Sequence, residues 1–295
     1  MKTEQELKAI VKEKYSKIAK QGKVENASSC CGATTPSNKV YNIMMDDYSD
    51  TDGYVSDADL GLGCGLPTQF AHINKGDTVI DLGSGAGNDC FVARHETGAE
   101  GKVIGIDFTP IMIEKARLNA DKLGYNNVEF REGDIDNMPV NANIADVVVS
   151  NCVLNLVPDK QKVISEIFRV LKPGGHFSIS DIVLVGNLPD ALREDAEMYA
   201  GCVAGAIQKT DYIQHIVDAG FASIKIQKEK AITIPDDILS KYLSLQEINE
   251  FKSGDLGIFS ITVYAEKPGE KTKKKKIKLS DLSDEPCCSP DGNCC

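Results

Sequence analysis

Cysteine stands out in this chain both by number and by placement. Ten cysteines occur among 295 residues. Thiolates act as nucleophiles, as redox partners and as ligands for soft metals and metalloids. The cysteines form an adjacent pair near the N-terminus, four single residues in the body and two adjacent pairs in the last nine residues. They are Cys30, Cys31, Cys64, Cys90, Cys152, Cys202, Cys287, Cys288, Cys294 and Cys295.

Three of the single cysteines occur in settings that favour chemistry. Cys64 has glycine on both sides, which gives an adaptable backbone. Cys152 directly follows a predicted strand, at the carboxyl edge where open α/β sheets bind ligands. Cys202 lies among small residues in or near a predicted helix. A lone cysteine is usually a small core hydrophobe, which is our interpretation of Cys90, but three in such settings favour a functional site.

An even cysteine count also occurs in secreted disulfide frameworks, but other features argue against that class. The first six residues, Met-Lys-Thr-Glu-Gln-Glu, lack the apolar stretch of a signal peptide. No run approaches the ~18 apolar residues of a membrane span. We therefore expect a cytoplasmic protein with reduced thiols and no membrane partner. There is no C-x-x-C pair and the four histidines lie apart, so the spacing does not predict a zinc site.

The composition is that of a soluble globular chain. Hydrophobic residues make up 42% and charged residues 26%. A chain of this length buries roughly 75% of its extended surface, so disulfides are not needed to complete a core. Lys and Arg total 33 against 44 Asp and Glu, a net charge of −11. This acidic balance argues against a nucleic-acid partner, because binding to phosphates needs a positive field.

A second chemical feature is a glycine-rich segment that follows an apolar run and precedes a predicted helix. Glycines there allow a tight turn and let a ligand touch the backbone. A dinucleotide fingerprint would need its third glycine where Asn88 stands. Asp107 ends the next predicted strand, 20 residues after Gly87, where an acid can bond both ribose hydroxyls. These features predict a nucleoside cofactor. The segment reads Asp81-Leu82-Gly83-Ser84-Gly85-Ala86-Gly87-Asn88.

The elements that must position these residues alternate along the middle of the chain. Such alternation predicts a parallel sheet with right-handed crossovers. An amphipathic helix over residues 5–19 comes first, then a long polar loop over 21–62 with at most one short helix. Predicted strands are 78–82, 102–107, one starting at 128, 145–150, 176–181, 224–226 and 258–265. Predicted helices are 110–123, 160–171, 192–207 and 211–219, with the Lys-Pro-Gly-Gly run at 172–175 as a helix breaker.

The run Val-Ile-Asp-Leu-Gly-Ser-Gly-Ala-Gly resembles the first motif of the S-adenosylmethionine-dependent methyltransferases, and Leu-Lys-Pro-Gly-Gly at 171–175 resembles their turn before the fifth strand. The resemblance covers residues 78–181. It implies a Rossmann-like class I α/β sheet with helices on both faces and S-adenosylmethionine as cofactor. It implies cofactor contacts from Asp81, Gly83, Gly85 and Gly87, a ribose contact from Asp107, adenine contacts from Phe108, Asp134 and Ile135, and a position near the methyl group for Asn151.

The cysteine segments resemble those of the arsenite methyltransferases. The matching segments are Leu-Gly-Leu-Gly-Cys-Gly at 60–65, Ser-Asn-Cys-Val-Leu-Asn-Leu at 150–156, Gly-Cys-Val-Ala-Gly-Ala at 201–206 and Ser-Cys-Cys-Gly at 29–32. The resemblance implies that Cys64, Cys152 and Cys202 bind trivalent arsenic. It also implies arsenite and methylarsenite as substrates, with a reductant of the thioredoxin or glutathione type.

The chemistry of arsenic explains the need for thiols. Arsenite is uncharged at neutral pH, so soft thiolates and not charges must hold it. Methylation formally oxidises arsenic, and two thiols can return two electrons by forming a disulfide. As a hypothesis we assign that step to Cys64 with Cys30 or Cys31. Methyl transfer itself needs no general base, so catalysis would depend on near-attack geometry.

The chain divides on this interpretation into four parts. Residues 1–35 carry a helix and the first thiol pair, 36–185 the cofactor domain, 186–266 a smaller arsenic-binding region, and 267–295 a lysine-rich linker with a mobile cysteine-rich tail. The tail has a net charge of +2 and the body −13. Its thiols, Cys287, Cys288, Cys294 and Cys295, could hold a soft metalloid, and scavenging, delivery and adventitious binding stay open.

Two other functions remain as alternatives. A small-molecule C- or O-methyltransferase of the quinone-biosynthesis type would use the cofactor motifs but leave the thiol segments without a purpose. A non-catalytic metalloid-binding protein would use the thiols but leave the glycine loop and Asp107 idle.

Overall fold

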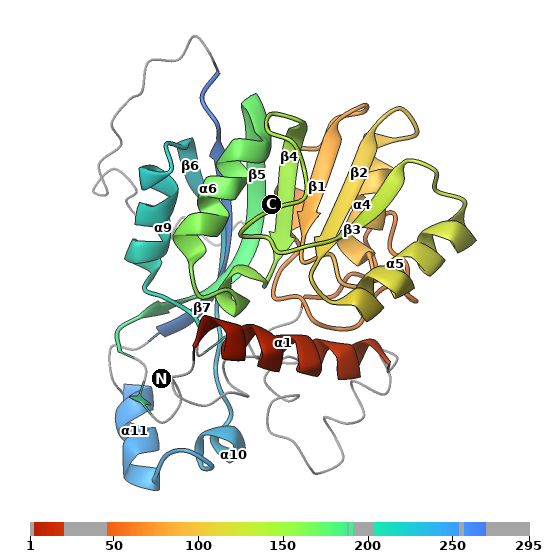
Figure 1. The fold of residues 1–295 in the computed structure, drawn as a ribbon. Coiled ribbons are helices and arrows are strands. Elements are labelled where there is room, and N and C mark those ends of the chain that lie inside the picture. The colour runs from red at the N-terminus through yellow and green to blue at the C-terminus, as the bar shows by residue number, and fades with distance from the viewer. Residues whose placement is uncertain are drawn as a thin grey trace, which may run out of the picture.

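The computed structural model describes residues 3–20, 46–187, 189–190, 203, 205–253 and 257–269. Within these residues the centre of the molecule is one seven-stranded sheet of order β3-β2-β1-β4-β5-β7-β6 (Figure 1). The first five strands pair in parallel, and β7 pairs antiparallel with both β5 and β6. The strands are β1 (Thr78–Leu82), β2 (Lys102–Asp107), β3 (Val128–Glu132), β4 (Ala145–Asn151), β5 (Leu171–Val185), β6 (Ala222–Ala231) and β7 (Gly257–Glu266).

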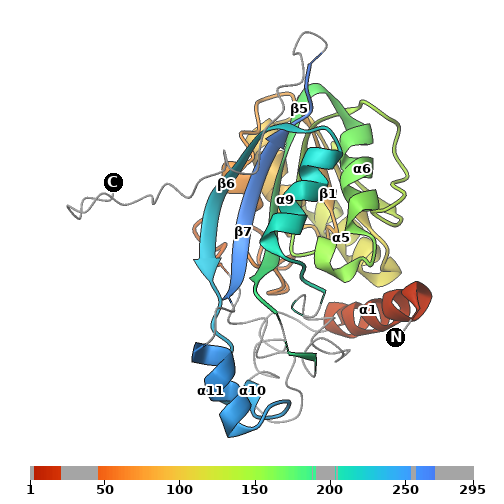
Figure 2. The same ribbon diagram turned by 90° about the vertical axis from the view of Figure 1, so that its left-hand side faces the viewer.

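Helices cover both faces of the sheet, as the resemblance to the class I methyltransferases implies. The buried sides of α4 (Asn88–Thr97) and α5 (Pro110–Leu123) form one core with alternate residues of β1, β2 and β4. On the other face, α6 (Lys160–Val170) and α9 (Lys209–Asp218) pack against the sheet in a second core (Figures 1 and 2). Central strands are buried on both faces, which explains their continuous apolar runs.

Helix α1 (Glu4–Ala19) runs across the edge at which β1 and β4 end (Figure 1). Thr3 and Glu6 form a capping box at its N-terminus, with each side chain bonded to the other residue's main-chain N–H. Val11 and Ile18 are buried on its inner side. The helix therefore lies over the carboxyl ends of the strands, where the cofactor loop and Cys152 are expected.

Smaller helical elements complete the described structure. The 3-10 turn η1 (Pro67–Phe70) follows the Cys64 segment and η2 (Leu154–Leu156) follows Cys152. The sequence interpretation did not predict α10 (Asp236–Leu239) and α11 (Leu245–Ser253), which lie between β6 and β7. Among the described residues, no helix combines the length and apolarity needed to cross a bilayer.

Two sequence expectations about the sheet were wrong in detail. The run at 172–175 does not separate a helix from a later strand, because β5 begins at Leu171 and reaches Val185. Leu171 pairs with Ala145, and the glycines at 174–175 exchange main-chain hydrogen bonds with Lys267. The strand predicted at 224–226 is longer than expected, because β6 runs from Ala222 to Ala231 and pairs with β7 along almost its whole length, whereas β7 differs from the predicted 258–265 by one residue at each end.

The other predicted strands and the helices at 5–19, 110–123, 160–171 and 211–219 are confirmed to within two residues at each end. The part of the long loop that is described, from residue 46 to 62, contains turns and no helix. The predicted helix at 192–207 lies largely outside the described residues. So do Cys30, Cys31, Cys202 and the tail cysteines Cys287, Cys288, Cys294 and Cys295. The division into four parts stays a prediction.

Candidate active site

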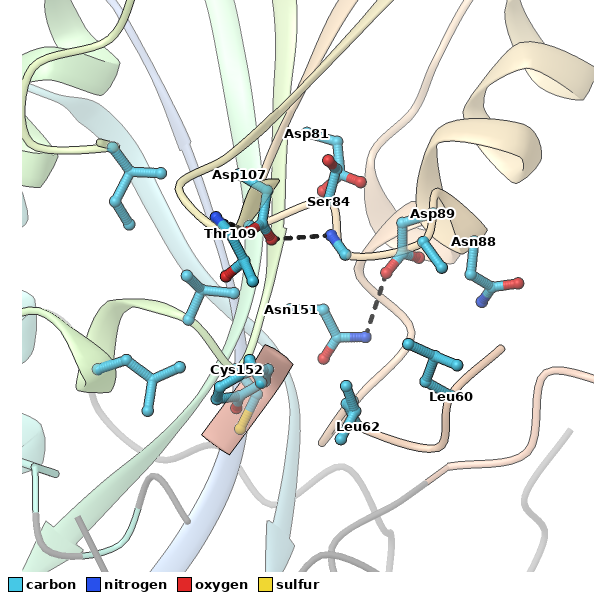
Figure 3. A pocket seen from close by; sticks show the side chains of 18 of the residues that line it. Leu60, Leu62, Asp81, Ser84, Asn88, Asp89, Asp107, Thr109, Asn151 and Cys152 are labelled. Carbon is cyan, nitrogen blue, oxygen red and sulfur yellow. Dashed lines mark hydrogen bonds between the residues drawn. The ribbon is translucent and has the colours of Figure 1, made fainter. Parts of the chain in front are cut away.

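A pocket opens where the carboxyl ends of β1, β2 and β4 meet the inner side of α1 and the segment at 58–63 (Figure 3). The strands of a doubly wound sheet bind their ligands at this edge. The pocket brings together nearly all the residues predicted to contact a cofactor. The predicted residues that line it are Asp81, Gly83, Gly85, Asp107, Phe108, Asp134, Ile135, Asn151 and Cys152.

Gly87 does not line the pocket, unlike the other two glycines of the loop. It is the residue before α4 and has φ +101°, a conformation that strains any residue with a side chain. A Cβ there would lie 2.9 Å from ring atoms of both Phe91 and Phe130. Its role is to turn the chain and let α4 pack against aromatic side chains.

The glycine loop leaves polar groups unsatisfied toward the pocket. Gly83 and Gly85 have φ values of +66° and +51°, which present their peptides in a turn open to a ligand. Ser84 Oγ and Asn88 Oδ1 are buried and have no hydrogen-bond partner in the structure. Both residues line the pocket. Buried polar atoms are rarely left unpaired, so these two fit the polar groups of a bound cofactor.

Asp107 is oriented by the main chain around it. Its carboxylate accepts hydrogen bonds from Gly85 N at 3.0 Å and Thr109 N at 2.8 Å (Figure 3). Burial raises the pKa of Asp107, while these two main-chain donors and the charge of Lys12 on α1 oppose the rise. A carboxylate held in this way keeps lone pairs for a diol, as a ribose contact requires.

Asp81 and Cys90 form a buried pair behind the loop. Cys90 Sγ donates to Asp81 Oδ2 at 3.2 Å. Burial and the negative charge of Asp89 raise the pKa of Asp81 well above its usual range. Burial and the charge of Asp81 likewise raise the pKa of Cys90, so the thiol keeps its proton. Cys90 is fully buried, which confirms the core interpretation.

Cys64 and Cys152 come from segments far apart in the chain and pack into one buried cluster. Cys152 has φ +60°, and its N–H donates to Ser180 O at 2.7 Å. Cys64 N–H donates to Asn151 Oδ1 at 3.0 Å, so its peptide lies against the residue preceding Cys152. Cys152 lines the pocket, whereas Cys64 is buried behind Gly63, which does.

The same cluster contains residues from the N-terminal helix and from the region after β5. Val11 of α1 and Val203 both pack in it. Val203 follows Cys202 directly in the chain. A described neighbour of the third predicted thiol therefore lies in the cluster that holds the other two.

The polar residues of this pocket that the sequence did not predict include Tyr48, Asp59 and Asp89. Burial raises the pKa of Asp89 to about 6, although hydrogen bonds from Tyr48 and Asn151 oppose the rise. The only signal in the sequence was the acid directly before Cys90, at the start of a predicted helix. Tyr48 carried no signal, because it lies in the polar segment that was interpreted as a loop.

Comparisons with known proteins agree with this geometry. A family model described as "Methyltransferase domain" matches residues 73–220. The arsenite methyltransferase of Halobacterium salinarum is 39% identical over 273 residues, which cover 90% of this chain and 67% of the relative. The human arsenite methyltransferase is 35% identical over 61% of this chain, and the chain spans only 50% of that relative.

Among solved structures, the chain is similar to an arsenic(III) S-adenosylmethionine methyltransferase from Chlamydomonas reinhardtii. The two share 30% identity with a TM-score of 0.61, over 82% of this chain and 77% of that one. The similarity extends beyond residues 73–220, since 82% of the chain is more than the family model matches.

Proposed function

The chain belongs to the arsenite methyltransferase family, and from this premise we propose that it transfers methyl groups from S-adenosylmethionine to trivalent arsenic bound by cysteine thiolates. One observation carries the proposal. Cys64 and Cys152, 88 positions apart in the sequence, share a buried cluster beside the cofactor pocket. Val203, next to Cys202, packs in the same cluster.

The cofactor would be held by the residues that line the pocket. Asp107 would take the ribose hydroxyls, Phe108 and Ile135 would flank the adenine, and Asp134 would bond its edge. Ser84 and Asn88, with their unsatisfied oxygens, would bond its polar groups. S-adenosylmethionine supplies an electrophilic methyl group. Polar side chains near Asn151 would then form one part of the pocket lining, and buried apolar side chains near Cys152 would form the other.

Three thiols would bind the substrate. Arsenite, As(OH)₃, exchanges its three hydroxyls for Cys64, Cys152 and Cys202, and each thiol proton leaves in a water molecule. The product is a pyramidal, neutral arsenic with an exposed lone pair, which the apolar surroundings tolerate because no net charge is buried. The chain's contribution to the rate is to hold this lone pair toward the pocket.

A thiol pair would restore trivalent arsenic after methylation. The thiol of Cys30 or Cys31 would attack the Cys64 sulfur that is bound to the methylated, pentavalent arsenic, so that an S–S bond forms while the bond between arsenic and Cys64 breaks. The electron pair of the broken bond stays on arsenic, which returns to the trivalent state, and the proton of the attacking thiol passes to solvent. A dithiol reductant of the thioredoxin type, or two glutathione thiols, then reopens the disulfide by thiol exchange. Methylarsenite formed in this way can serve as the next substrate.

The test of the proposed function is an assay on the full-length protein. The protein is incubated with methyl-labelled S-adenosylmethionine, arsenite and a thiol reductant, and label on arsenic is measured. We expect methylated arsenicals from the wild type and at least about a 100-fold loss in Cys152→Ser. S-adenosylhomocysteine should bind the variant with an affinity within about threefold of the wild type. Label that never reaches arsenic in the wild type would exclude this function.

A further inference from the structure

Next to the segment that carries Cys64, three side chains from three separate segments form a partly buried chain of hydrogen bonds. Tyr48 Oη lies 2.8 and 2.9 Å from the carboxylate oxygens of Asp89, at the start of α4. Asn151 Nδ2, at the end of β4, lies 2.5 Å from Tyr48 Oη. It also lies 3.4 Å from Asp89 Oδ2, as Figure 3 shows. The methyl transfer described above uses neither Tyr48 nor Asp89.

We propose that Asp89 and Tyr48 are positioning residues that set the place of the Cys64 thiol by fixing the orientation of the Asn151 amide. The proposal rests on the proposed function, because it gives Tyr48 and Asp89 a part in binding arsenic at Cys64. Neither residue would touch the arsenic itself.

The directions of the hydrogen bonds follow from the charge of Asp89. A carboxylate only accepts, so the Tyr48 hydroxyl must donate its single proton to it. The Tyr48 oxygen is then an acceptor, and Asn151 Nδ2 donates to it and to Gly65 O at 2.8 Å. This leaves Asn151 Oδ1 facing Cys64 N–H, which donates to it at 3.0 Å. An Asn151 amide turned the other way would place a donor against the Cys64 donor.

The Cys64 peptide is also held from its other side. Ser260 Oγ, on β7, donates to Cys64 O at 2.6 Å. The two glycines that flank Cys64 are closely packed, because a Cβ on Gly63 would lie 2.5 Å from Asn151 Nδ2. A Cβ on Gly65 would lie 2.5 Å from Ser180 Oγ. On its N–H side, the Cys64 peptide is held by the oxygen of the Asn151 amide.

The segment that carries Tyr48 is itself anchored to the far edge of the sheet. Asp46 Oδ2 lies 2.6 Å from Lys228 Nζ, and Asp46 Oδ1 lies 3.3 Å from Lys230 Nζ, both on β6. Tyr48 is buried, with 5% of its surface exposed. The chain of bonds therefore runs from an anchored segment to the Cys64 peptide without a solvent-exposed member.

The experiment compares Tyr48→Phe with the wild type in full-length protein whose four tail cysteines are replaced by serine. Arsenite binding is measured by equilibrium dialysis with elemental detection, and S-adenosylhomocysteine binding by calorimetry. Without its hydroxyl, residue 48 no longer orders the Asn151 amide. We expect the Kd for arsenite and the KM for arsenite to rise about tenfold, while the Kd for S-adenosylhomocysteine changes less than threefold.

Two further variants make the result specific. Tyr125→Phe removes a hydroxyl from a half-buried tyrosine packed on Phe91 and is expected to change none of these constants. Asp89→Asn keeps an acceptor for Tyr48 but lacks the charge, so its arsenite Kd should fall between those of the wild type and Tyr48→Phe. Because asparagine nearly preserves shape, this variant serves if Tyr48→Phe fails to fold.

The outcomes separate this inference from the proposed function. If the wild type binds arsenite no better than Cys64→Ser, the proposed function fails. If the wild type binds and methylates arsenite but Tyr48→Phe keeps its arsenite Kd within twofold, the positioning role is wrong. Equal rises in the Kd values for arsenite and S-adenosylhomocysteine would also overturn it, since they indicate general damage to the pocket.

Discussion

At the scale of single residues, the molecule buries several acids, and Asp181 is the least exposed of those that the structure describes. It lies within β5 with no exposed surface. Its oxygens accept from Ile182 N at 3.1 Å and, at 3.5 Å, from the Tyr212 hydroxyl. Burial raises the pKa of Asp181 from 3.8 to about 7, although the charge of Lys160 opposes the rise. At neutral pH this acid is therefore close to half protonated.

The raised pKa of Asp181 predicts how stability depends on pH. The folded state binds this proton more tightly than the unfolded chain does. The resulting contribution to the free energy of unfolding is therefore complete below about pH 4 and is lost as pH rises through 7. The Asp181→Asn variant has no carboxyl group to ionise, so its stability does not fall in this way. Between pH 5 and pH 8 the variant should gain about 2 to 3 kcal/mol relative to the wild type in urea unfolding.

The control for this measurement is Asp121→Asn, at an exposed carboxyl on α5. Its unfolding free energy should run parallel to that of the wild type from pH 5 to pH 8. If the unfolding free energy of Asp181→Asn also followed that of the wild type from pH 5 to pH 8, Asp181 would have the same protonation in the folded and unfolded chain. A partner would then have to stabilise the buried carboxylate throughout this range.

At the scale of elements, the segment carrying Cys64 lies on a strip of small hydroxyl side chains on β5 and β7. Ser178 Oγ donates to Pro67 O at 2.8 Å and Ser260 Oγ to Cys64 O at 2.6 Å. Ser180 and Thr262 bond each other at 2.8 Å between them. Small residues let the segment approach the sheet, and their hydroxyls satisfy its carbonyls.

Gly65→Ala tests how closely this segment packs. The new Cβ would lie 2.5 Å from Ser180 Oγ and 2.7 Å from Ser180 Cβ, and neither atom can withdraw from a buried strand. We expect a loss of about 1 to 3 kcal/mol in unfolding free energy. Adding Ser180→Gly to Gly65→Ala should recover part of the loss, so the two changes should be coupled. Strict additivity of the two substitutions would show that the segment lies farther from β5.

A glycine in an open position provides the matched control. A Cβ added to Gly269 meets nothing within 4 Å, so Gly269→Ala should leave the unfolding free energy within about 0.5 kcal/mol of the wild type.

At the scale of the whole molecule, the described fold is anchored as far as Lys267, just after β7. Its Nζ donates at 2.7 Å to each of three acceptors, Asn143 Oδ1, Phe168 O and Leu171 O. Its main-chain N–H bonds Gly175 O at 2.8 Å. Every buried residue of the described core precedes this point. Removing the residues after Gly269 therefore leaves all these contacts in place.

Truncation after Gly269 should separate the stability of the fold from the supply of substrate. We expect the Tm to change by less than about 2 °C, because no described core contact is removed. If the four tail thiols raise the local arsenite concentration, the KM for arsenite should rise about threefold with kcat unchanged. The full-length protein with four cysteine-to-serine changes in the tail should give the same KM. An unchanged KM at low arsenite would contradict delivery by the tail.

Elements and residues whose place depends on near neighbours in the chain could be predicted from the amino-acid sequence. The apolar run before the glycine loop predicted β1, and Asp107 was expected at the end of β2, where the structure has it. These predictions succeed because the signals for strands, turns and helices lie within a few residues of each other in the sequence. The contexts of Cys64 and Cys152 likewise indicated a thiol site at the carboxyl edge of the sheet.

Only the tertiary structure decided how those residues meet. The hydrogen bond from Cys64 to Asn151 joins residues 87 positions apart, and that from Ser260 to Cys64 spans 196. No local pattern marks Tyr48 as the partner of Asp89, because its role depends on α4 and β4 lying beside the same loop. Only the fold shows that a Cβ added at Gly87 would lie 2.9 Å from ring atoms of both Phe91 and Phe130. Residue type and spacing select the chemistry, but contacts between distant segments, set by the close packing of the sheet and its helices, decide which groups perform it.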